Sequence, residues 1–294
     1  MPIAFNDYWS RHGDDPAGVF RELPGLVPLA ETPVELLQIA ALVTHLAGGH
    51  LGQWSEGLGQ LSDLRTSTHF DPETAQGRAI HRCEAVLFRG VGDVAASEEA
   101  LRLAQNPGSP PDQARLGMLT VLAEARVNLG EIEAGAETFD EALRLAAYGP
   151  DGSDPASRGL AISANNITCY LETVADRTDA QTAFMKTTAA TARTWWEIAG
   201  DWTHVKIAEY RLAMTHLAAG EPSTALEHGR KALALVDANE GSDGDRFYPW
   251  LAVGLAHLAL GEGDAARHAV TQAQKEVPDW GRAELEALEV QLAG

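Results

Sequence analysis

Ten histidines and two cysteines are the side chains of this 294-residue chain that most readily bind metal ions. His45 and His50 are five residues apart, and we place a turn between them, so we do not expect them to share a helix face. The chain has no His-Glu-x-x-His motif, and Cys83 and Cys169 stand singly rather than in a Cys-x-x-Cys pair. We therefore predict no metal site and no cofactor, and the single cysteines fit a reducing compartment.

Two other residue groups suggest chemistry without completing a known site. Residues 237–245 place oxygen-bearing side chains at alternate positions, at Asp237, Asn239, Asp243 and Asp245, but a calcium-binding EF-hand would need Gly at Ser242 and Glu at Tyr248. Trp195, Trp196, Trp202 and Glu197 could line the funnel of an α/α-toroid glycan hydrolase, which needs two carboxylates. We interpret the first group as a helix connection and the second as a packing cluster. Phosphate-binding glycine loops and Gly-x-Ser-x-Gly elbows are also missing, so we predict a non-enzymatic protein.

Charge and terminal sequence narrow the class of protein. The chain has 22 basic and 42 acidic residues, a net charge of −20, and its basic residues are scattered rather than clustered. Because such a surface repels a phosphate backbone, we do not expect nucleic acid as a partner. The N-terminus has no basic start followed by an apolar run, and the apolar stretches are short or interrupted. We therefore expect a cytoplasmic protein with no membrane partner.

A recurring phrase organises most of the chain. In its clearest copies a glycine is followed by an acidic residue, and small residues stand five and twelve positions after the glycine. The anchors of the phrase are Gly49, Gly92, Gly130, Ala175, Gly220 and Gly261, spaced 38 to 45 residues apart. A segment with helical periodicity lies on each side of every anchor, and a glycine tolerates the positive φ that a tight reversal requires. The pattern predicts antiparallel helix pairs.

Helix starts are marked independently of the anchors. Thr32 and Glu35 flank Pro33 in the arrangement of a capping box, and a capping residue precedes proline again at Asp71-Pro72, Ser109-Pro110, Asp154-Pro155 and Glu221-Pro222. We predict an all-α protein with an N-terminal capping segment over 1–31, about six antiparallel helix pairs over 32–278, and a C-terminal capping helix over 279–294. The sequence shows no strand pattern of useful length.

The repeats resemble tetratricopeptide (TPR) repeats, with longer spacings than the 34 residues typical of that family. The sixth copy matches best, through Trp250, Val253, Gly254, Gly261, Ala266, Val270, Ala273 and Pro278. The resemblance is good over 109–278 and weaker over 32–108. It implies an α–α superhelix whose first helices line a concave face that binds a protein or peptide partner. His216 and His257 occupy equivalent positions in copies five and six, which favours packing between paired helices.

Candidate binding residues follow from the exposed edge of each first helix, counted back from its turn. They are Arg82, Arg89, Thr120, Glu124, Asn128, Asn165, Glu172, Tyr210, Arg211, Met214 and Tyr248, with Leu36, Ile39 and Val43 in the first copy. Amides and guanidinium groups pair with a peptide backbone or carboxylate, and a tyrosine adds contact area and a hydrogen bond. We expect Arg82, Arg89 and Arg211 on the inner side, so an acidic partner remains an alternative despite the net negative charge.

The resulting functional hypothesis is a non-catalytic protein-interaction or adaptor module of a bacterial cytoplasm, with a homo-oligomer left open. Two alternatives remain. One is a regulatory sensor of the same architecture that closes around a small molecule or signalling peptide. The other is the α/α-toroid hydrolase.

Overall fold

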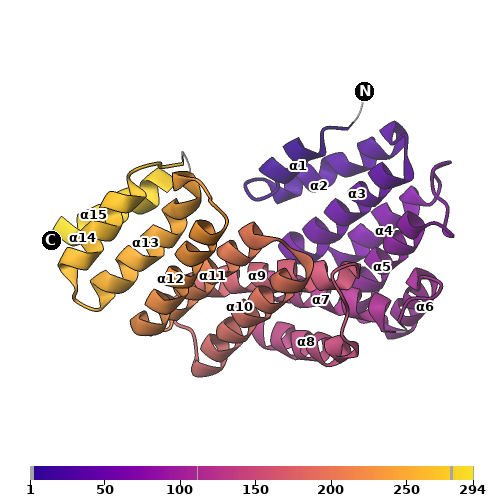
Figure 1. The fold of residues 1–294 in the computed structure, drawn as a ribbon. Coiled ribbons are helices and arrows are strands. Elements are labelled where there is room, and N and C mark those ends of the chain that lie inside the picture. The colour runs from indigo at the N-terminus through magenta and orange to yellow at the C-terminus, as the bar shows by residue number, and fades with distance from the viewer. Residues whose placement is uncertain (1–2, 111, 279–280, 294) are drawn as a thin grey trace. The chain divides into compact units, whose positions relative to one another are not determined.

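The computed structural model describes residues 3–110, 112–278 and 281–293, with the side chain of residue 293 left out. All regular structure in those residues is helical, which confirms the predicted all-α class. The chain divides into two compact units, residues 1–150 and 151–294, which are called the N-terminal and C-terminal units below (Figure 1). The predicted segments 1–31, 32–278 and 279–294 stay a prediction, and residues 1–2, 279–280 and 294 of the two caps lie outside the described residues.

The N-terminal unit contains three helix pairs preceded by a short helical segment. The segment consists of α1 (Phe5–Arg11), α2 (Pro16–Glu22) and the 3₁₀ helix η1 (Leu23–Leu29). The pairs are α3 (Pro33–Thr44) with α4 (Trp54–Leu64), α5 (Ala75–Gly90) with α6 (Val94–Ala104), and α7 (Gln113–Asn128) with α8 (Ile132–Leu145). The π-helix η2 (His45–Leu51) joins α3 to α4, and the 3₁₀ turn η3 (Ala146–Tyr148) follows α8.

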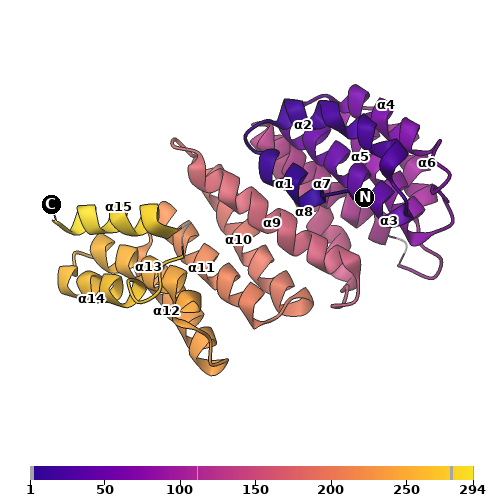
Figure 2. The same ribbon diagram turned by 90° about the horizontal axis from the view of Figure 1, so that it is seen from above.

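The C-terminal unit contains three further pairs and one closing helix. The pairs are α9 (Pro155–Thr173) with α10 (Asp179–Ala199), α11 (Trp202–Ala218) with α12 (Pro222–Ala238), and α13 (Asp243–Ala259) with α14 (Gly263–Ala273). The closing helix α15 (Arg282–Ala293) packs against α13 and α14 (Figure 2). Within this unit the first helices α9, α11 and α13 also contact one another in order, so each pair stacks on the next. The described residues thus form the six predicted helix pairs.

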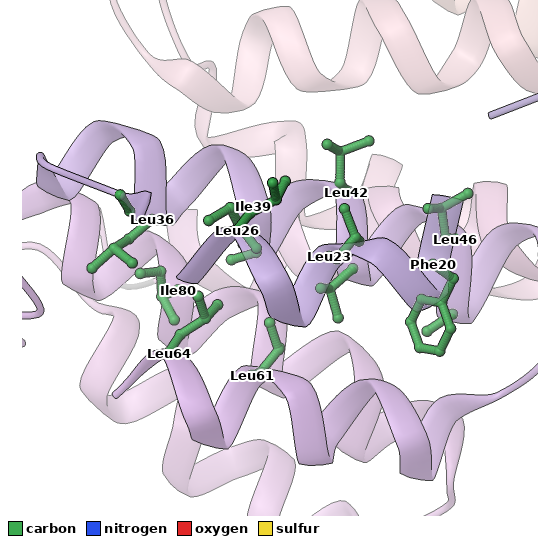
Figure 3. Close-up of a cluster of buried hydrophobic side chains, with 14 of the residues drawn as sticks. Phe20, Leu23, Leu26, Leu36, Ile39, Leu42, Leu46, Leu61, Leu64 and Ile80 are labelled. Atoms are coloured by element: carbon green, nitrogen blue, oxygen red, sulfur yellow. The ribbon is translucent and has the colours of Figure 1, made fainter. Parts of the chain in front are cut away.

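The N-terminal segment covers the first pair with apolar side chains. Phe20, Leu23 and Leu26 are buried against Leu36 and Ile39 of α3, in a core that extends to α4 and α5 (Figure 3). The first copy therefore offers no exposed groove, and the prediction that Leu36, Ile39 and Val43 line one is wrong. The segment Pro33–Leu51 is the one described helix long and apolar enough to cross a membrane by composition alone. Its burial in this core accounts for that apolar character.

The predicted reversal at Gly49 is wrong, because the chain does not turn there. Residues 45–51 continue α3 as a π-helix, and the chain reverses at Gly52, whose φ is +63°. Gly48 and Gly49 are buried inside the π-helix. A Cβ on Gly48 would lie 2.7 Å from the Trp54 ring, so the absence of a side chain lets the indole approach this helix. The periodicity that marked Gly49 therefore reflected close packing rather than a turn.

The other glycine anchors do form the predicted turns. Gly92, Gly130, Gly220 and Gly261 all have positive φ, between +73° and +85°. In copies five and six a histidine near the end of the first helix reaches the glutamate that follows the glycine. His216 Nδ1 lies 2.6 Å from the Glu221 carboxylate, and His257 Nδ1 lies 2.5 Å from that of Glu262. These equivalent contacts tie the two helices of each pair across the turn.

The fourth turn, predicted at Ala175, forms without a glycine. The guanidinium of Arg177 donates hydrogen bonds to the carbonyls of Leu171, Glu172 and Val174 at the end of α9, and to the carbonyl of Ala218. The last carbonyls of a helix have no partner within the helix, so this side chain replaces the missing C-cap.

Helix starts agree with the capping signals in three of five places. Thr32 and Asp154 accept hydrogen bonds from the backbone of the first turns of α3 and α9, and α12 begins at Pro222. At Asp71-Pro72 the predicted start is wrong, because Thr74 is the capping residue and α5 begins at Ala75. Helix α7 likewise begins at Gln113 rather than at Pro110.

Candidate functional site

Six of the predicted binding residues lie on the first helices of the C-terminal unit. Asn165 and Glu172 lie on α9, Tyr210, Arg211 and Met214 on α11, and Tyr248 on α13. All six are half-buried, which is the state expected of side chains at the edge of packed helices. Contacts and shared pockets connect Glu172, Tyr210, Arg211, Met214 and Tyr248, and we call the surface formed by these five residues and their neighbours on α11 and α13 the α11–α13 surface.

An ion pair between α9 and α11 stands at the centre of this surface. The Arg211 guanidinium lies 2.5 Å from one oxygen of Glu172, and the Thr215 hydroxyl donates to the other oxygen at 2.8 Å. Burial raises the pKa of Glu172 in spite of Arg211. For Arg211 burial lowers the pKa, but its neighbours together, Glu172 first among them, raise it overall. Of the two shifts, only that of Glu172 can change a charge at an accessible pH, because arginine stays protonated throughout. Arg211 is thus neutralised within the unit.

Two tyrosines link α11 to α13. The rings of Tyr210 and Tyr248 lie 5.2 Å apart between centroids, tilted by 50°, and the Arg211 guanidinium lies 5.7 Å from the Tyr210 ring. Burial raises the pKa of Tyr210 to about 12. The pair supplies aromatic area at low conformational cost, which is the composition typical of binding surfaces.

Two pockets follow one another along α11 and α13. The larger, of about 760 Å³, is lined by Tyr210, Arg211 and Tyr248 together with residues of α15 and of the segment before it. The smaller, of about 420 Å³, is lined by Met214, Leu217, Leu255 and Leu258, with Glu172 at its edge. Arg211 lines the first pocket and its partner Glu172 the second, so the ion pair lies where the two pockets meet.

The larger pocket is acidic in balance. Lys206 forms an ion pair with Asp245 at 2.8 Å, which leaves Glu276 and Glu284 as the remaining charges of the lining besides Arg211. Glu276 accepts a hydrogen bond from the backbone of Gly244, and no described side chain forms an ion pair with it or with Glu284. The smaller pocket is mainly apolar. The surface therefore joins an acidic pocket to an apolar one.

In the N-terminal unit the structure overturns two of the predicted binding residues. Thr120 is 1% exposed and donates its hydroxyl hydrogen bond to the carbonyl of Leu116, and Glu124 is 9% exposed. Both are covered because α7 packs against α5, α8 and the π-helix, so nearly every face of α7 is in contact. Neither side chain is presented at a surface edge.

The other three predicted residues of this unit are half-buried, and they lie apart. Arg82 of α5 lies over Gly117 of α7, where a Cβ would come within 3.1 Å of its side chain. The hydrogen bond and charge of Arg115 lower the pKa of Glu98, and Arg89 lies close enough to that carboxyl to lower it further. Asn128 lies beside Gly49 of the π-helix. The predicted continuous groove over all six repeats stays a prediction.

The residues behind the calcium-site and glycan-hydrolase hypotheses are engaged in other contacts. Of residues 237–245, Asp237 lies at the end of α12 and pairs with Arg246. Asp245 lies in the first turn of α13, where it pairs with Lys206 and accepts a hydrogen bond from the capping Ser242. These carboxylates are therefore distributed over separate contacts.

The tryptophan cluster is likewise engaged in packing. Trp196 is buried and stacks on His204 with ring centroids 4.5 Å apart, and the Arg158 guanidinium lies 5.2 Å from its ring. Glu197 is exposed and pairs with Arg193 at 2.8 Å. The pair of cavity carboxylates that glycan hydrolysis needs is not assembled by these residues.

Two sets of residues escaped the sequence prediction. Lys206 and Asp245 belong to the α11–α13 surface, and they stand one helical turn before Tyr210 and Tyr248, a spacing that could have indicated them. Glu276 and Glu284 lie beyond the last predicted repeat. The second set is His12, His45 and His50, whose potential metal-ligand atoms all lie within 4.8 Å of one another. The prediction had separated His45 from His50 by a turn that is not there.

The described architecture is that of an all-α helical-repeat protein built from consecutive antiparallel pairs. No protein-family profile matches the sequence, and no curated protein matches it. Among solved structures it is similar to BtubC (BKLC) from P. vanneervenii, at 18% identity and a TM-score of 0.47, over 93% of this chain and 91% of that one. It is also similar to a Podosopora anserina chain described as a putative kinesin light chain with nearly identical TPR-like repeats, at 16% identity and a TM-score of 0.45, over 75% and 97%. A single-substitution variant of that protein gives the same identity and TM-score, over 70% and 96%.

Proposed function

We propose that this chain is a non-catalytic interaction module that binds a peptide segment of a partner protein along the α11–α13 surface. The observation that carries the proposal is the pair of adjoining pockets, one acidic and one apolar, on the same two helices. Binding surfaces are typically aromatic-rich and apolar at the centre with a polar rim, and Tyr210, Tyr248, Met214 and Leu258 supply that composition.

The chemistry of the pockets defines the partner segment. Because Arg211 is neutralised by Glu172, the earlier expectation of an acidic partner loses its main support in this unit. Glu276 and Glu284 favour a basic side chain in the larger pocket, and Met214, Leu217 and Leu258 favour an apolar side chain in the smaller one. The two pockets extend along α11 from Lys206 to Ala218, which is about 18 Å at about 1.5 Å per residue. A three-turn helix or about six extended residues would span that length.

The test needs no partner protein, because peptides that bind the purified chain can be selected from a displayed peptide library. We expect the selected peptides to combine apolar residues with a lysine or arginine. Tyr248→Ala and Met214→Asp should each weaken their binding at least about tenfold, since central anchors of an interface cost about 2 kcal/mol or more. The matched control is Ile198→Asp, an exposed apolar residue on the second helix α10, which should leave binding unchanged.

Two results would contradict the proposal. One is selected peptides that bind Tyr248→Ala and Met214→Asp as well as the original chain, with all variants folded by circular dichroism. The other is a set of selected peptides rich in acidic residues, which would place recognition elsewhere.

The regulatory-sensor alternative is supported by one observation, the volume of the larger pocket. About 760 Å³ lies within the range of small-molecule sites, about 300–1,000 Å³. A thermal-shift screen of small cationic metabolites distinguishes the two functions. A compound that stabilises the chain but not Tyr248→Ala, together with no peptide selected on the α11–α13 surface, would favour the sensor.

A further inference from the structure

Three imidazole rings meet between the end of α1 and the π-helix of the N-terminal unit. His12 closes α1, and His45 and His50 both lie on η2. The ring centroids are 4.8 Å apart for His45 and His50, 5.0 Å for His12 and His45, and 5.3 Å for His12 and His50. All three side chains are half-buried, so they are both held in place and reachable from solvent.

The π-helix explains how residues five apart come to face each other. In an α-helix, positions i and i+5 point in different directions, whereas the wider π-turn pairs residue i with residue i+5. The Nε2 atoms of His45 and His50 accordingly lie 3.1 Å apart and share a hydrogen bond, so one of them carries a proton that a bound metal would displace. Four-coordinate zinc has Zn–N distances of about 2.0–2.1 Å, which place two ligand nitrogens about 3.3 Å apart. The separation of these two nitrogens is close to that spacing.

His12 is held in the tautomer that a third ligand needs. Its Nδ1 is in close hydrogen-bond contact with the backbone carbonyl of Trp9, so Nδ1 carries the proton and Nε2 keeps its lone pair. Metal-bound imidazoles usually donate their other ring N–H to a carbonyl or carboxylate in this way. His12 stands at the end of a short helix, and it is the ligand best able to shorten its distance to the other two.

The surroundings favour the neutral imidazoles that bind metal. Burial, followed by the neighbouring His50 and His12, lowers the pKa of His45 to about 4, and burial with His12 also lowers the pKa of His50. The ring of Trp9 lies 5.3 Å from those of His12 and His45 and covers one side of the cluster. The group contains neither a carboxylate nor a thiolate. An all-imidazole set suits zinc, copper or nickel rather than the oxygen-preferring magnesium or calcium.

We propose that His12, His45 and His50 bind one Zn²⁺ ion through three imidazole nitrogens, with water in the fourth position. Three histidines with an open fourth position are a known zinc geometry. The ion would tie α1 to the π-helix and so stabilise the N-terminal segment against the first helix pair, because a ligand that binds only the folded state shifts the folding equilibrium. This site is independent of the α11–α13 surface and of the function proposed for it.

The test uses the full chain without a histidine tag, freed of metal and dialysed against Zn²⁺ at micromolar concentration. We expect one Zn²⁺ per chain, a higher melting temperature with Zn²⁺, and a four-coordinate visible spectrum when Co²⁺ replaces it. Loss of a residue that only hydrogen-bonds a metal ligand weakens binding about 10–100-fold. His12→Ala and His50→Ala each remove a ligand, so each should weaken Zn²⁺ binding by more than that. The matched control is His69→Ala, an exposed histidine of the same unit, which should bind as the original chain does.

Both variants lie at sites where folding should survive, since His12 closes a seven-residue helix at the surface and His50 is half-exposed. Zinc uptake well below one ion per folded chain would overturn the proposal. Uptake that His12→Ala and His50→Ala leave unchanged would overturn it equally, because another group would then hold the metal.

Discussion

Two glycines of α4 offer a direct test of how closely this helix packs on the π-helix. Gly57 is buried, and a Cβ placed on it would lie 2.6 Å from the Cβ of Ala47 in the π-helix and 2.9 Å from a methyl of Leu87. Gly59 stands two residues later on the exposed side of the same helix, and a Cβ there would meet nothing within 4 Å. The substitutions Gly57→Ala and Gly59→Ala therefore share a helix and differ in packing.

The two variants should change stability in opposite directions. Replacing glycine by alanine inside a helix stabilises it by about 0.5–1 kcal/mol, a gain that both variants receive. Gly57→Ala adds the cost of overpacking, about 1–3 kcal/mol, because the Ala47 methyl is fixed to its backbone and the two helices must move apart. We expect Gly59→Ala to be more stable than the original chain and Gly57→Ala to be less stable, by about 1–2 kcal/mol.

Urea unfolding followed by circular dichroism measures both free energies of unfolding, and hydrogen exchange in α4 assigns the change to this unit. Adding Ala47→Gly to Gly57→Ala should recover part of the loss, with a coupling of more than about 0.5 kcal/mol between two touching sites. Equal effects of Gly57→Ala and Gly59→Ala, or strict additivity with Ala47→Gly, would refute the close approach of α4 and the π-helix.

Three further predictions concern turns, caps and the binding surface. Gly130→Ala should lower the free energy of unfolding by about 1–2 kcal/mol in urea titrations, because φ at this turn is +82° and a Cβ disfavours it. Ser242→Ala should lower it by about 1 kcal/mol, since the serine forms a capping box with Asp245 at the start of α13. In spectrophotometric titration, Tyr210→Phe should remove the phenol that ionises near pH 12. The folded-state pKa of Tyr210 is raised above its ordinary value near 10, so its contribution to stability is lost as pH rises from about 10 through 12 in the original chain and not in the variant.

Most of the helix pairs were predictable because they repeat the same local signals. Gly130, Gly220 and Gly261 mark reversals that need positive φ, and an acidic residue after each glycine precedes the next helix. Small residues five positions after these glycines are Gly135, Ala225 and Ala266, all buried where paired helices approach. Periodicity and turn chemistry are local, so one sequence is enough to reveal them.

The binding residues were only partly predictable, because exposure depends on which helices surround a given face. Counting back from the turn placed Tyr210, Arg211 and Tyr248 on one surface, since α11 and α13 neighbour each other directly. The same count failed for Thr120 and Glu124, because α7 is packed against α5, α8 and the π-helix. It also gave no sign that Arg211 is paired with Glu172, a contact between residues 39 positions apart.

The histidine cluster was not predicted from the sequence because it lies where the repeat pattern fails. A chain that follows the repeat would reverse at Gly49 and point His45 and His50 away from each other. Instead the side-chain-free Gly48 accepts the Trp54 ring, Gly57 lets α4 approach, and the helix continues as a π-turn to Gly52. π-Turns within helices occur often at functional sites, and departures from local rules tend to coincide with function. The irregularity that hid the cluster in the sequence is also the geometry that assembles it, so a variant that restores a regular turn at Gly49 should separate the two imidazoles.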